Sequence, residues 1–133
     1  MLHGVRTHLG IDHGLCGEPR ALGPGTAEVA LVTTPAMAAD AEGLCHGGFV
    51  FGLADHAAML AVNHPHVVLG GATTKFLRPV RVGETVVAAA TRTAEAGRKH
   101  TVAVEVRRGD DVVFTGEFTC FVLDRHVLAA GGT

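Results

Sequence analysis

The segment from Gly47 to Val62 constrains the fold of this chain most strongly. It reads GGFVFGLADHAAMLAV, which is long enough for a helix and is apolar on almost every side. A helix that is apolar all round has to be buried. Asp55 stands in the middle of this segment, where a carboxylate is costly unless it is paired, hydrated or used in chemistry. The sequence therefore predicts one long buried helix, and we interpret Asp55 as catalytic rather than as a structural anomaly.

Glycine and proline residues separate four later segments that are rich in β-branched residues. The predicted strands in this part cover residues 67–77, 84–93, 98–107 and 112–123. An earlier strand is expected over residues 27–32, with residues 16–22 as its candidate partner. Apolar and polar residues alternate along the last two strands, so one face of the sheet is apolar and needs a cover. The buried helix supplies it, which predicts the α+β class and the hotdog fold, a curved antiparallel sheet wrapped around one long central helix.

The composition limits both the number of domains and the kind of partner. The chain has 133 residues, of which 47% are hydrophobic, and no linker or repeat interrupts it. We expect a single domain over residues 1–133, with its core at residues 9–123 and a frayed tail at residues 129–133. A net charge of −2 excludes the broad basic surface that nucleic-acid-binding proteins use. The expected partners are therefore small molecules or proteins, and not nucleic acids.

The cysteine and histidine residues indicate a reduced compartment and no metal. The three cysteines are an odd number without metal-ligand spacing, which favours a cytoplasmic location. No apolar run reaches the roughly 20 residues of a membrane span, and the first residues lack the apolar core of a signal peptide. The pair His64 and His66 belongs to no regularly spaced set of three ligands, so we expect neither a metal nor a cofactor.

Three short motifs surround the predicted helix. They are DAEGLC from Asp40, HGG from His46 with Asp55 following, and TTKFLRPV from Thr73 with Gly83 following. Together they resemble the hotdog thioesterases of the PaaI (phenylacetate-degradation) type in the 4-hydroxybenzoyl-CoA thioesterase superfamily. The resemblance covers residues 9–123. It implies an enzyme that hydrolyses acyl-CoA thioesters as a homodimer or dimer of dimers, without a metal.

The motifs provide the two groups that thioester hydrolysis needs. Gly47 and Gly48 begin the helix, where backbone N–H groups lack acceptors, the helix dipole is positive and the absence of Cβ allows close approach. A carbonyl oxygen docked there is stabilised as it becomes an oxyanion. Asp55 then acts as the general base or, as the alternative, as the nucleophile. The resemblance assigns the positioning of the water to Thr73, with Thr74 as a close alternative.

Other residues of the motifs and turns have supporting assignments. His46 is expected to support the oxyanion turn rather than to exchange the catalytic proton. Arg98 and Lys99, on a turn beside a glycine, are candidates to bind the phosphates of CoA, with a solvated turn as the alternative. Asp40 departs from the family, which usually has asparagine six residues before this histidine to help hold the thioester oxygen. Because a carboxylate facing the oxyanion would oppose catalysis, either Asp40 points away, the loop differs, or turnover is slow.

The spacing of the two central groups predicts a site shared between subunits. Eight helical residues separate Gly47 from Asp55 by about 12 Å along the axis and roughly 80° around it. One aspartate side chain cannot close that gap onto a single carbonyl. If the site uses both groups, the second must come from another copy of the helix that runs antiparallel across a two-fold axis.

Two other functions remain open from the sequence. The first is a hotdog hydratase or dehydratase acting on acyl thioesters, which would rely on a catalytic histidine, with His46 and His56 nearest to the helix. The second is a non-catalytic module that binds acyl-CoA. Release of a free thiol distinguishes hydrolysis from both alternatives, because neither of them breaks the thioester.

Overall fold

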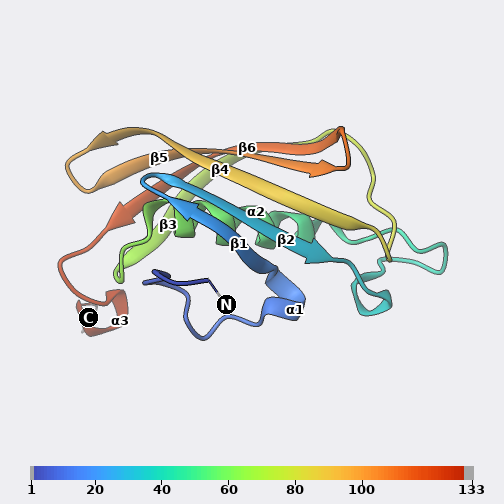
Figure 1. The fold of residues 1–133 in the computed structure, drawn as a ribbon, viewed down its shortest axis with the longest axis horizontal. Helices are drawn as coiled ribbons and strands as arrows, with labels where there is room; N and C mark the ends of the chain where they lie inside the picture. Colours follow the sequence, from blue (N-terminus) through green and yellow to red (C-terminus); the bar gives the residue numbers. More distant parts are fainter. Residues whose placement is uncertain (1, 131–133) are drawn as a thin grey trace.

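A long central helix organises the structure, a computed structural model that describes residues 2–130 (Figure 1). This helix, α2, covers Gly47–Val62, as the sequence predicts. It ends at Asn63, whose left-handed backbone (φ 53°) lets its N–H donate to the Met59 carbonyl. No helix in the described part of the chain is long and apolar enough to cross a membrane.

Six strands form one antiparallel sheet over α2. They are β1 (Glu18–Gly23), β2 (Thr26–Val32), β3 (Val67–Phe76), β4 (Thr85–Ala96), β5 (Lys99–Arg108) and β6 (Asp111–Val122). Their order across the sheet is β1-β2-β4-β5-β6-β3, and every neighbouring pair is antiparallel. The predicted strands are confirmed with small shifts at their ends, and so is the pairing of the first two. The curved antiparallel sheet around α2 confirms the α+β hotdog fold.

Three short helices were not predicted from the sequence. They are α1 (His13–Cys16), the 3-10 helix η1 (Pro35–Met37) and α3 (Val127–Ala130). A single contact starts α1, because the Asp12 side chain accepts a hydrogen bond from the Leu15 N–H at 3.1 Å. Two residues of the tail that was expected to fray belong to α3, and residues 131–133 of that tail lie outside the described residues.

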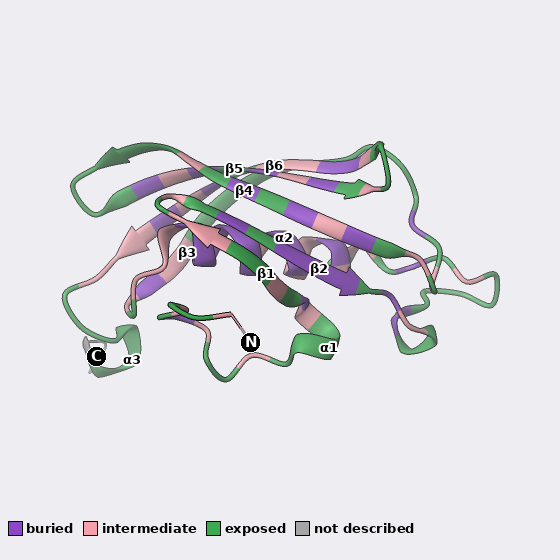
Figure 2. Cartoon of the chain, viewed as in Figure 1, coloured by how far each residue is buried: buried purple, intermediate pink, exposed green. Residues whose placement is uncertain are grey.

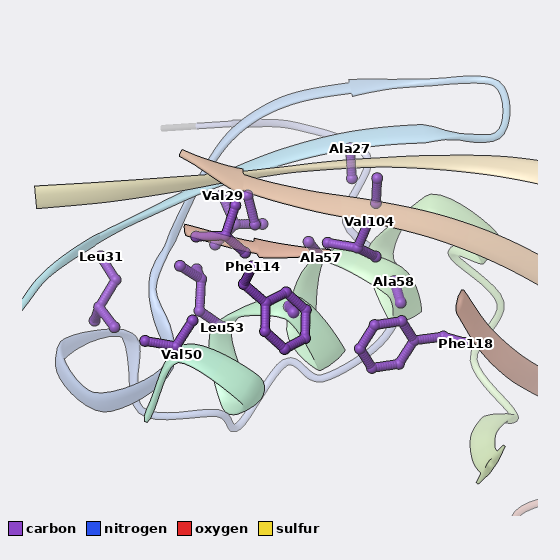
Figure 3. Packing of buried hydrophobic residues seen from close by; sticks show 14 of the residues in the cluster. Ala27, Val29, Leu31, Val50, Leu53, Ala57, Ala58, Val104, Phe114 and Phe118 are labelled. Atoms are coloured by element: carbon purple, nitrogen blue, oxygen red, sulfur yellow. The ribbon is translucent and has the colours of Figure 1, made fainter. Parts of the chain in front are cut away.

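The core lies between α2 and the concave face of the sheet (Figure 2). The helix packs chiefly against β2, β4 and β5. Figure 3 shows how residues of the helix meet those of the strands, with Leu53 and Ala57 facing Val29, Val104 and Phe114. The alternation read from the sequence is confirmed, since the valines at even positions on β5 and the phenylalanines of β6 at 114 and 118 are buried.

The N-terminal segment covers a further side of α2. Residues 2–17 pass below the helix in Figure 1 and are tied to it by hydrogen bonds. The Asn63 side chain donates to the Gly4 carbonyl and accepts from the Arg6 N–H, both at 2.8 Å, and His56 Nδ1 lies 3.1 Å from the Cys16 carbonyl. One stripe of the helix is left only partly covered. We call it the open stripe, and it consists of Gly48, Phe51, Gly52 and Asp55.

Candidate active site

Backbone hydrogen bonds hold the loop that leads into α2. The N–H of Cys45 donates to the Val80 carbonyl and that of His46 to the Met37 carbonyl, both at 2.8 Å. The next two amides, those of Gly47 and Gly48, donate to no described residue. Two free N–H groups thus stand at the positive end of the helix dipole, an arrangement that can polarise a carbonyl oxygen.

Both glycines at the helix start allow a side chain to approach the backbone. A Cβ on Gly47 would lie 3.1 Å from the ring of Phe76, and a Cβ on Gly48 would lie 3.0 Å from the ring of His46. The His46 ring therefore folds over the helix start, where it also meets Phe49 edge-on with ring centroids 6.2 Å apart. These contacts give His46 a packing role at the turn.

The residues after β3 act as a support for this loop. The Val82 N–H donates to the Gly43 carbonyl at 2.8 Å, and the Thr33 hydroxyl donates to the Glu84 carbonyl at 2.7 Å. Arg108 donates to the Pro79 carbonyl at 2.8 Å and contacts the Glu84 carboxylate at 3.2 Å. The end of the TTKFLRPV motif and the residues that follow it thus have a structural role that was not predicted from the sequence. They fix the position of the two free amides.

Asp55 lies on the open stripe, two turns beyond the helix start. Its Oδ1 atom is buried and has no hydrogen-bond partner among the described residues. Burial raises the pKa of this carboxyl to about 6. No arginine or lysine in the described part of the chain forms an ion pair with it. At neutral pH Asp55 is therefore an ionised carboxylate without a counter-charge, which suits a general base.

Two cysteine thiols lie within the electric field of Asp55. Burial, followed by the charges of Asp12 and Asp55, raises the pKa of the Cys16 thiol. Burial and the charge of Asp55 raise the pKa of the Cys120 thiol to about 12. Burial also raises the pKa of Cys45, which lies beside the helix start. All three thiols are uncharged at neutral pH, so none of them is an activated nucleophile.

The register of β3 separates the two candidate threonines. Thr73 pairs with Glu117 and Thr74 pairs with Gly116, and directly opposed residues share a face of the sheet. Phe118 is on the same face as Gly116, and its ring packs against Phe51 of α2 at 5.6 Å. Thr74 therefore faces the helix and Thr73 faces away from it. The resemblance favours Thr73, whereas of the two it is Thr74 whose side chain lies on the helix-facing side of β3.

Asp40 stabilises the loop before the helix. Its Oδ1 atom accepts hydrogen bonds from the Glu42 N–H at 2.9 Å and the Leu44 N–H at 3.2 Å. The side chain lines a hollow of about 690 Å³ together with Arg81 and Arg108, and Gly47 is not part of that wall. One carboxylate oxygen is thus already used within the loop.

A separate apolar pocket opens beside the helix start. It has a volume of about 270 Å³ and is lined by Gly47, Val50, Phe76, Val80 and Val113, among others. The wall offers hydrocarbon surface directly next to the free amide of Gly47. This pocket is suited to an apolar group attached to a carbonyl.

Arg98 and Lys99 lie far from the helix start of the same chain. Arg98 lines a hollow with Asn63 and His64, which follow α2, and its guanidinium contacts the Asp124 carboxylate at 2.6 Å. Lys99 is exposed at the beginning of β5. Since α2 has 16 residues, these cations lie about 24 Å along the helix from Gly47.

Comparison with known proteins finds a matching family model and similar solved structures. A family model described as the thioesterase superfamily matches residues 42–115, which include the helix start, Asp55 and β3. An uncharacterized protein from Pyrococcus horikoshii shares the fold with a TM-score of 0.92 and 50% identity, over 93% of this chain and 95% of that protein. A variant of the phenylacetic acid degradation protein PaaI from Thermus thermophilus has a TM-score of 0.76 and 33% identity, over 82% of this chain and 95% of that protein.

Two relatives of known name are considerably longer than this chain. Methylthioribose-1-phosphate isomerase from Aquifex aeolicus is 52% identical over 121 residues, which are 90% of this chain and 26% of the isomerase. The transcription factor FapR from Shouchella clausii is 36% identical over 80 residues, which are 60% of this chain and 42% of FapR. The chain thus spans less than half the length of these relatives.

Proposed function

Since the chain belongs to the thioesterase superfamily, we propose that it is a PaaI-type acyl-CoA thioesterase, which hydrolyses an acyl thioester to a free acid and CoA. The observation that carries this proposal is the unpaired carboxylate of Asp55 on a helix that begins with two free amides. One group supplies a base and the other supplies an oxyanion site. The similarity to PaaI supports the choice of reaction.

In the proposed mechanism, the thioester oxygen accepts hydrogen bonds from the amides of Gly47 and Gly48. Asp55 takes a proton from a water molecule, and the hydroxyl of Thr74 orients that water toward the carbonyl carbon. The new C–O bond forms, the C–S bond breaks, and the departing thiolate receives the proton from Asp55. In the alternative, Asp55 attacks the carbon directly, the C–S bond breaks to release the CoA thiolate, and water then hydrolyses the resulting anhydride to the free acid, regenerating Asp55 and giving a proton to the thiolate.

We propose that two copies of the chain build each site. Gly47 and Asp55 are about 12 Å apart along one helix, so one chain does not present both groups to the same carbonyl. The open stripe leaves space on α2, and the outer edge of β3 has no partner strand in the described part of the chain. A homodimer, or a dimer of dimers, with antiparallel helices would place Asp55 of one copy near Gly47 of the other.

The substrate is proposed to extend in two directions from this carbonyl. The apolar pocket beside Gly47 would hold the acyl group. In the same antiparallel dimer, the far end of the partner helix lies about 10 Å beyond Gly47, since seven residues follow Asp55 in α2. This would bring Arg98 and Lys99 of the partner within reach of the CoA phosphates. We propose a cytoplasmic location for the reaction, supported by three cysteines that are all free thiols.

The two alternative functions differ in their support. A hydratase or dehydratase would need a free catalytic histidine, but His56 is buried between the rings of His8 and His13 and is engaged with the Cys16 carbonyl. A non-catalytic acyl-CoA-binding module has one observation in its favour, the similarity to the transcription factor FapR.

A thiol-release assay tests the proposed function. The purified protein is incubated with aryl, short, medium and long acyl-CoAs, and free CoA is measured with a thiol reagent. We expect turnover of at least one class by the wild-type protein and a strong loss in Asp55→Asn. Binding of acyl-CoA without thiol release from any of them would contradict hydrolysis and favour the binding module.

A further inference from the structure

A hollow of about 570 Å³ lies at the far end of α2, opposite the helix start. Its wall collects basic side chains from separate parts of the chain, which are Arg6, His64, His66, Arg92, Arg98 and His100. They come from the N-terminal segment, the loop after α2, β4, the turn after β4 and β5. We call this feature the histidine–arginine hollow.

The hollow contains more positive than negative groups. Its two carboxylates are already engaged, since Glu95 lies 3.8 Å from Arg92 and 3.9 Å from His100, and Asp124 lies 2.6 Å from Arg98. The side chains of Arg6, His64 and His66 have no carboxylate within 4.0 Å among residues 2–130. A negative ligand would therefore meet the Arg6 cation and two imidazole rings that no carboxylate of the described residues pairs with.

Two ring nitrogens in the same wall have no partner. The Nδ1 atoms of His66 and His100 are buried and make no hydrogen bond in the described structure, and His100 is only 7% exposed. Buried polar atoms without partners are uncommon and often indicate an absent ion or water. His64 Nδ1 accepts from the His66 N–H at 3.0 Å, so the Nε2 atom of a neutral His64 carries its proton and acts as a donor.

The field within the hollow is positive. Partial burial lowers the pKa of His64, and the charges of His66, Arg6 and His100 lower this pKa further. A bound anion would oppose this effect, since it would favour the protonated form of His64.

We propose that the histidine–arginine hollow binds a phosphate group of a small-molecule ligand. Arginine forks and imidazolium rings match the several acceptor oxygens of phosphate. A cation is a poor fit, because three arginines line the wall and no three His, Cys, Asp or Glu side chains of the described residues converge as metal ligands. The phosphate can belong to the CoA part of a substrate or to a free phosphorylated effector.

Charged and titratable groups from several segments surround the histidines of the hollow. The histidines face Arg6 from the N-terminal segment, Arg92 and Glu95 from β4, Arg98 and Asp124 from the neighbouring turns, and His8 and His126 from behind His66. A dianion placed among them would also meet the guanidinium groups of Arg6, Arg92 and Arg98, which stay charged at neutral pH.

Calorimetric titration of the full chain with inorganic pyrophosphate tests the proposal. We expect saturable binding at about pH 6 and at about pH 8, because the arginines that line the hollow stay protonated at both. The double variant R6Q/H66Q should lose about tenfold or more in affinity. Arg107→Gln removes the same kind of charge at the opposite end of β5, where Arg107 contacts Glu105, and should bind as the wild type does. Arg98→Gln, at an exposed position, gives a second test if the double variant does not fold.

A competition experiment distinguishes the two sources of phosphate. If pyrophosphate raises the KM for acyl-CoA, the hollow holds the phosphates of CoA. If pyrophosphate binds and leaves this KM unchanged, the ligand is a separate effector. The proposal is overturned if pyrophosphate shows no saturable binding at either pH, or if Arg107→Gln weakens binding as much as the hollow variants do. Because the titration requires no hydrolysis, its outcome is independent of the proposed enzyme activity.

Discussion

Asp55 is a charged residue without a counter-charge in the described part of the chain. Its pKa of about 6 reflects the free energy that burial adds to its ionised form. A structural carboxylate in such a place would be paired with a cation or with several N–H groups. An unpaired carboxylate keeps its basicity for a reaction, at a cost to the stability of the fold.

The first prediction concerns the rate of thiol release. Asp55→Asn is nearly isosteric and cannot take a proton, so we expect kcat to fall by about 10²–10⁴. In the wild type, log(kcat/KM) should rise with pH and level off above about pH 6, as the base becomes ionised. Near wild-type kcat in a clean Asp55→Asn preparation would remove this residue from the mechanism.

The second prediction concerns stability. The pKa of Asp55 is raised from 3.8 to about 6 on folding, so its ionisation opposes folding. This penalty is absent below about pH 4 and complete above about pH 6. Asp55→Asn should therefore stabilise the protein by about 1–3 kcal/mol at about pH 8 and by almost nothing at about pH 4. Thermal unfolding at both pH values measures the difference, with Asp110→Asn in an exposed turn as the control. An equal gain at both pH values would contradict the assignment.

The third prediction concerns Asp40, where this chain departs from its family. Asparagine keeps the acceptor oxygen for the N–H groups of Glu42 and Leu44, so Asp40→Asn should keep the loop intact and change kcat by less than about threefold. Asp40→Ala loses both bonds and should lower kcat and stability together. A large increase of kcat in Asp40→Asn would instead show that the native carboxylate opposes the oxyanion. Thiol release and thermal unfolding on the same samples separate these outcomes.

The sequence indicated the candidate site residues by type but could not give their surroundings. The buried charge at Asp55 was predictable from its apolar neighbours, because burial follows from the pattern. The missing partner of that charge depends on which side chains from distant segments reach the helix. The role of Asp40 was undecided for the same reason. An aspartate at this position is compatible both with a contact within the loop and with a contact to the oxyanion.

At the scale of elements, α2 was predictable to the residue and the short helices were not. Two glycines begin α2, and Asn63, two residues before a proline, ends it. Both boundaries can therefore be predicted from the residues next to them. A four-residue helix such as α1 depends on one side-chain cap and has no periodicity to detect. The long strands were predicted for the opposite reason, since each alternates over many residues.

A bulge in β3 decides which of the two threonines faces the helix. The register shifts between Leu69 and Gly71, so the alternation before the shift does not continue after it. Without the shift, Thr73 would share the face of Val67 and Leu69. With it, Thr74 takes that face. A Cβ on Gly70 would come within 2.6 Å of the Phe121 ring, so the bulge depends on glycine at this position.

The fourth prediction uses the two threonines as a matched pair. Thr74→Val removes the hydroxyl that faces the helix and should lower kcat by about tenfold or more. Thr73→Val makes the same chemical change on the opposite face of β3 and should leave kcat close to wild type. Steady-state thiol release measures both. A larger loss of kcat in Thr73→Val than in Thr74→Val would assign the orientation of the water to Thr73. It would contradict the proposal that the threonine facing the helix has this role.

At the scale of the whole molecule, the open stripe and the free edge of β3 point to a second copy. The fifth prediction tests whether the site is shared. Asp55→Asn removes the base and Gly47→Val blocks the free amide, so each variant alone should be inactive. If Gly47 and Asp55 of one site come from different chains, a mixed dimer has one site with both defects and one with neither.

Equal amounts of the two variants should therefore recover roughly a quarter of wild-type activity after random exchange, since about half of the dimers are mixed. Size-exclusion chromatography and thermal unfolding confirm that each variant folds and assembles. Verified mixed dimers without recovered activity would show that one chain supplies the whole site.

The enclosure of α2 also has a consequence for synthesis of the protein. The helix packs on β2, β4, β5 and β6, yet only β1 and β2 precede it in the chain. The ribosome therefore makes an apolar helix before most of its cover exists, and β6 is complete only 60 residues after Val62. At a translation rate of about 5–20 residues per second, the helix waits about 3–12 s for that cover. During this interval the nascent chain exposes the surface that chaperones recognise, so its yield in cells depends on them as well as on the stability of the finished fold.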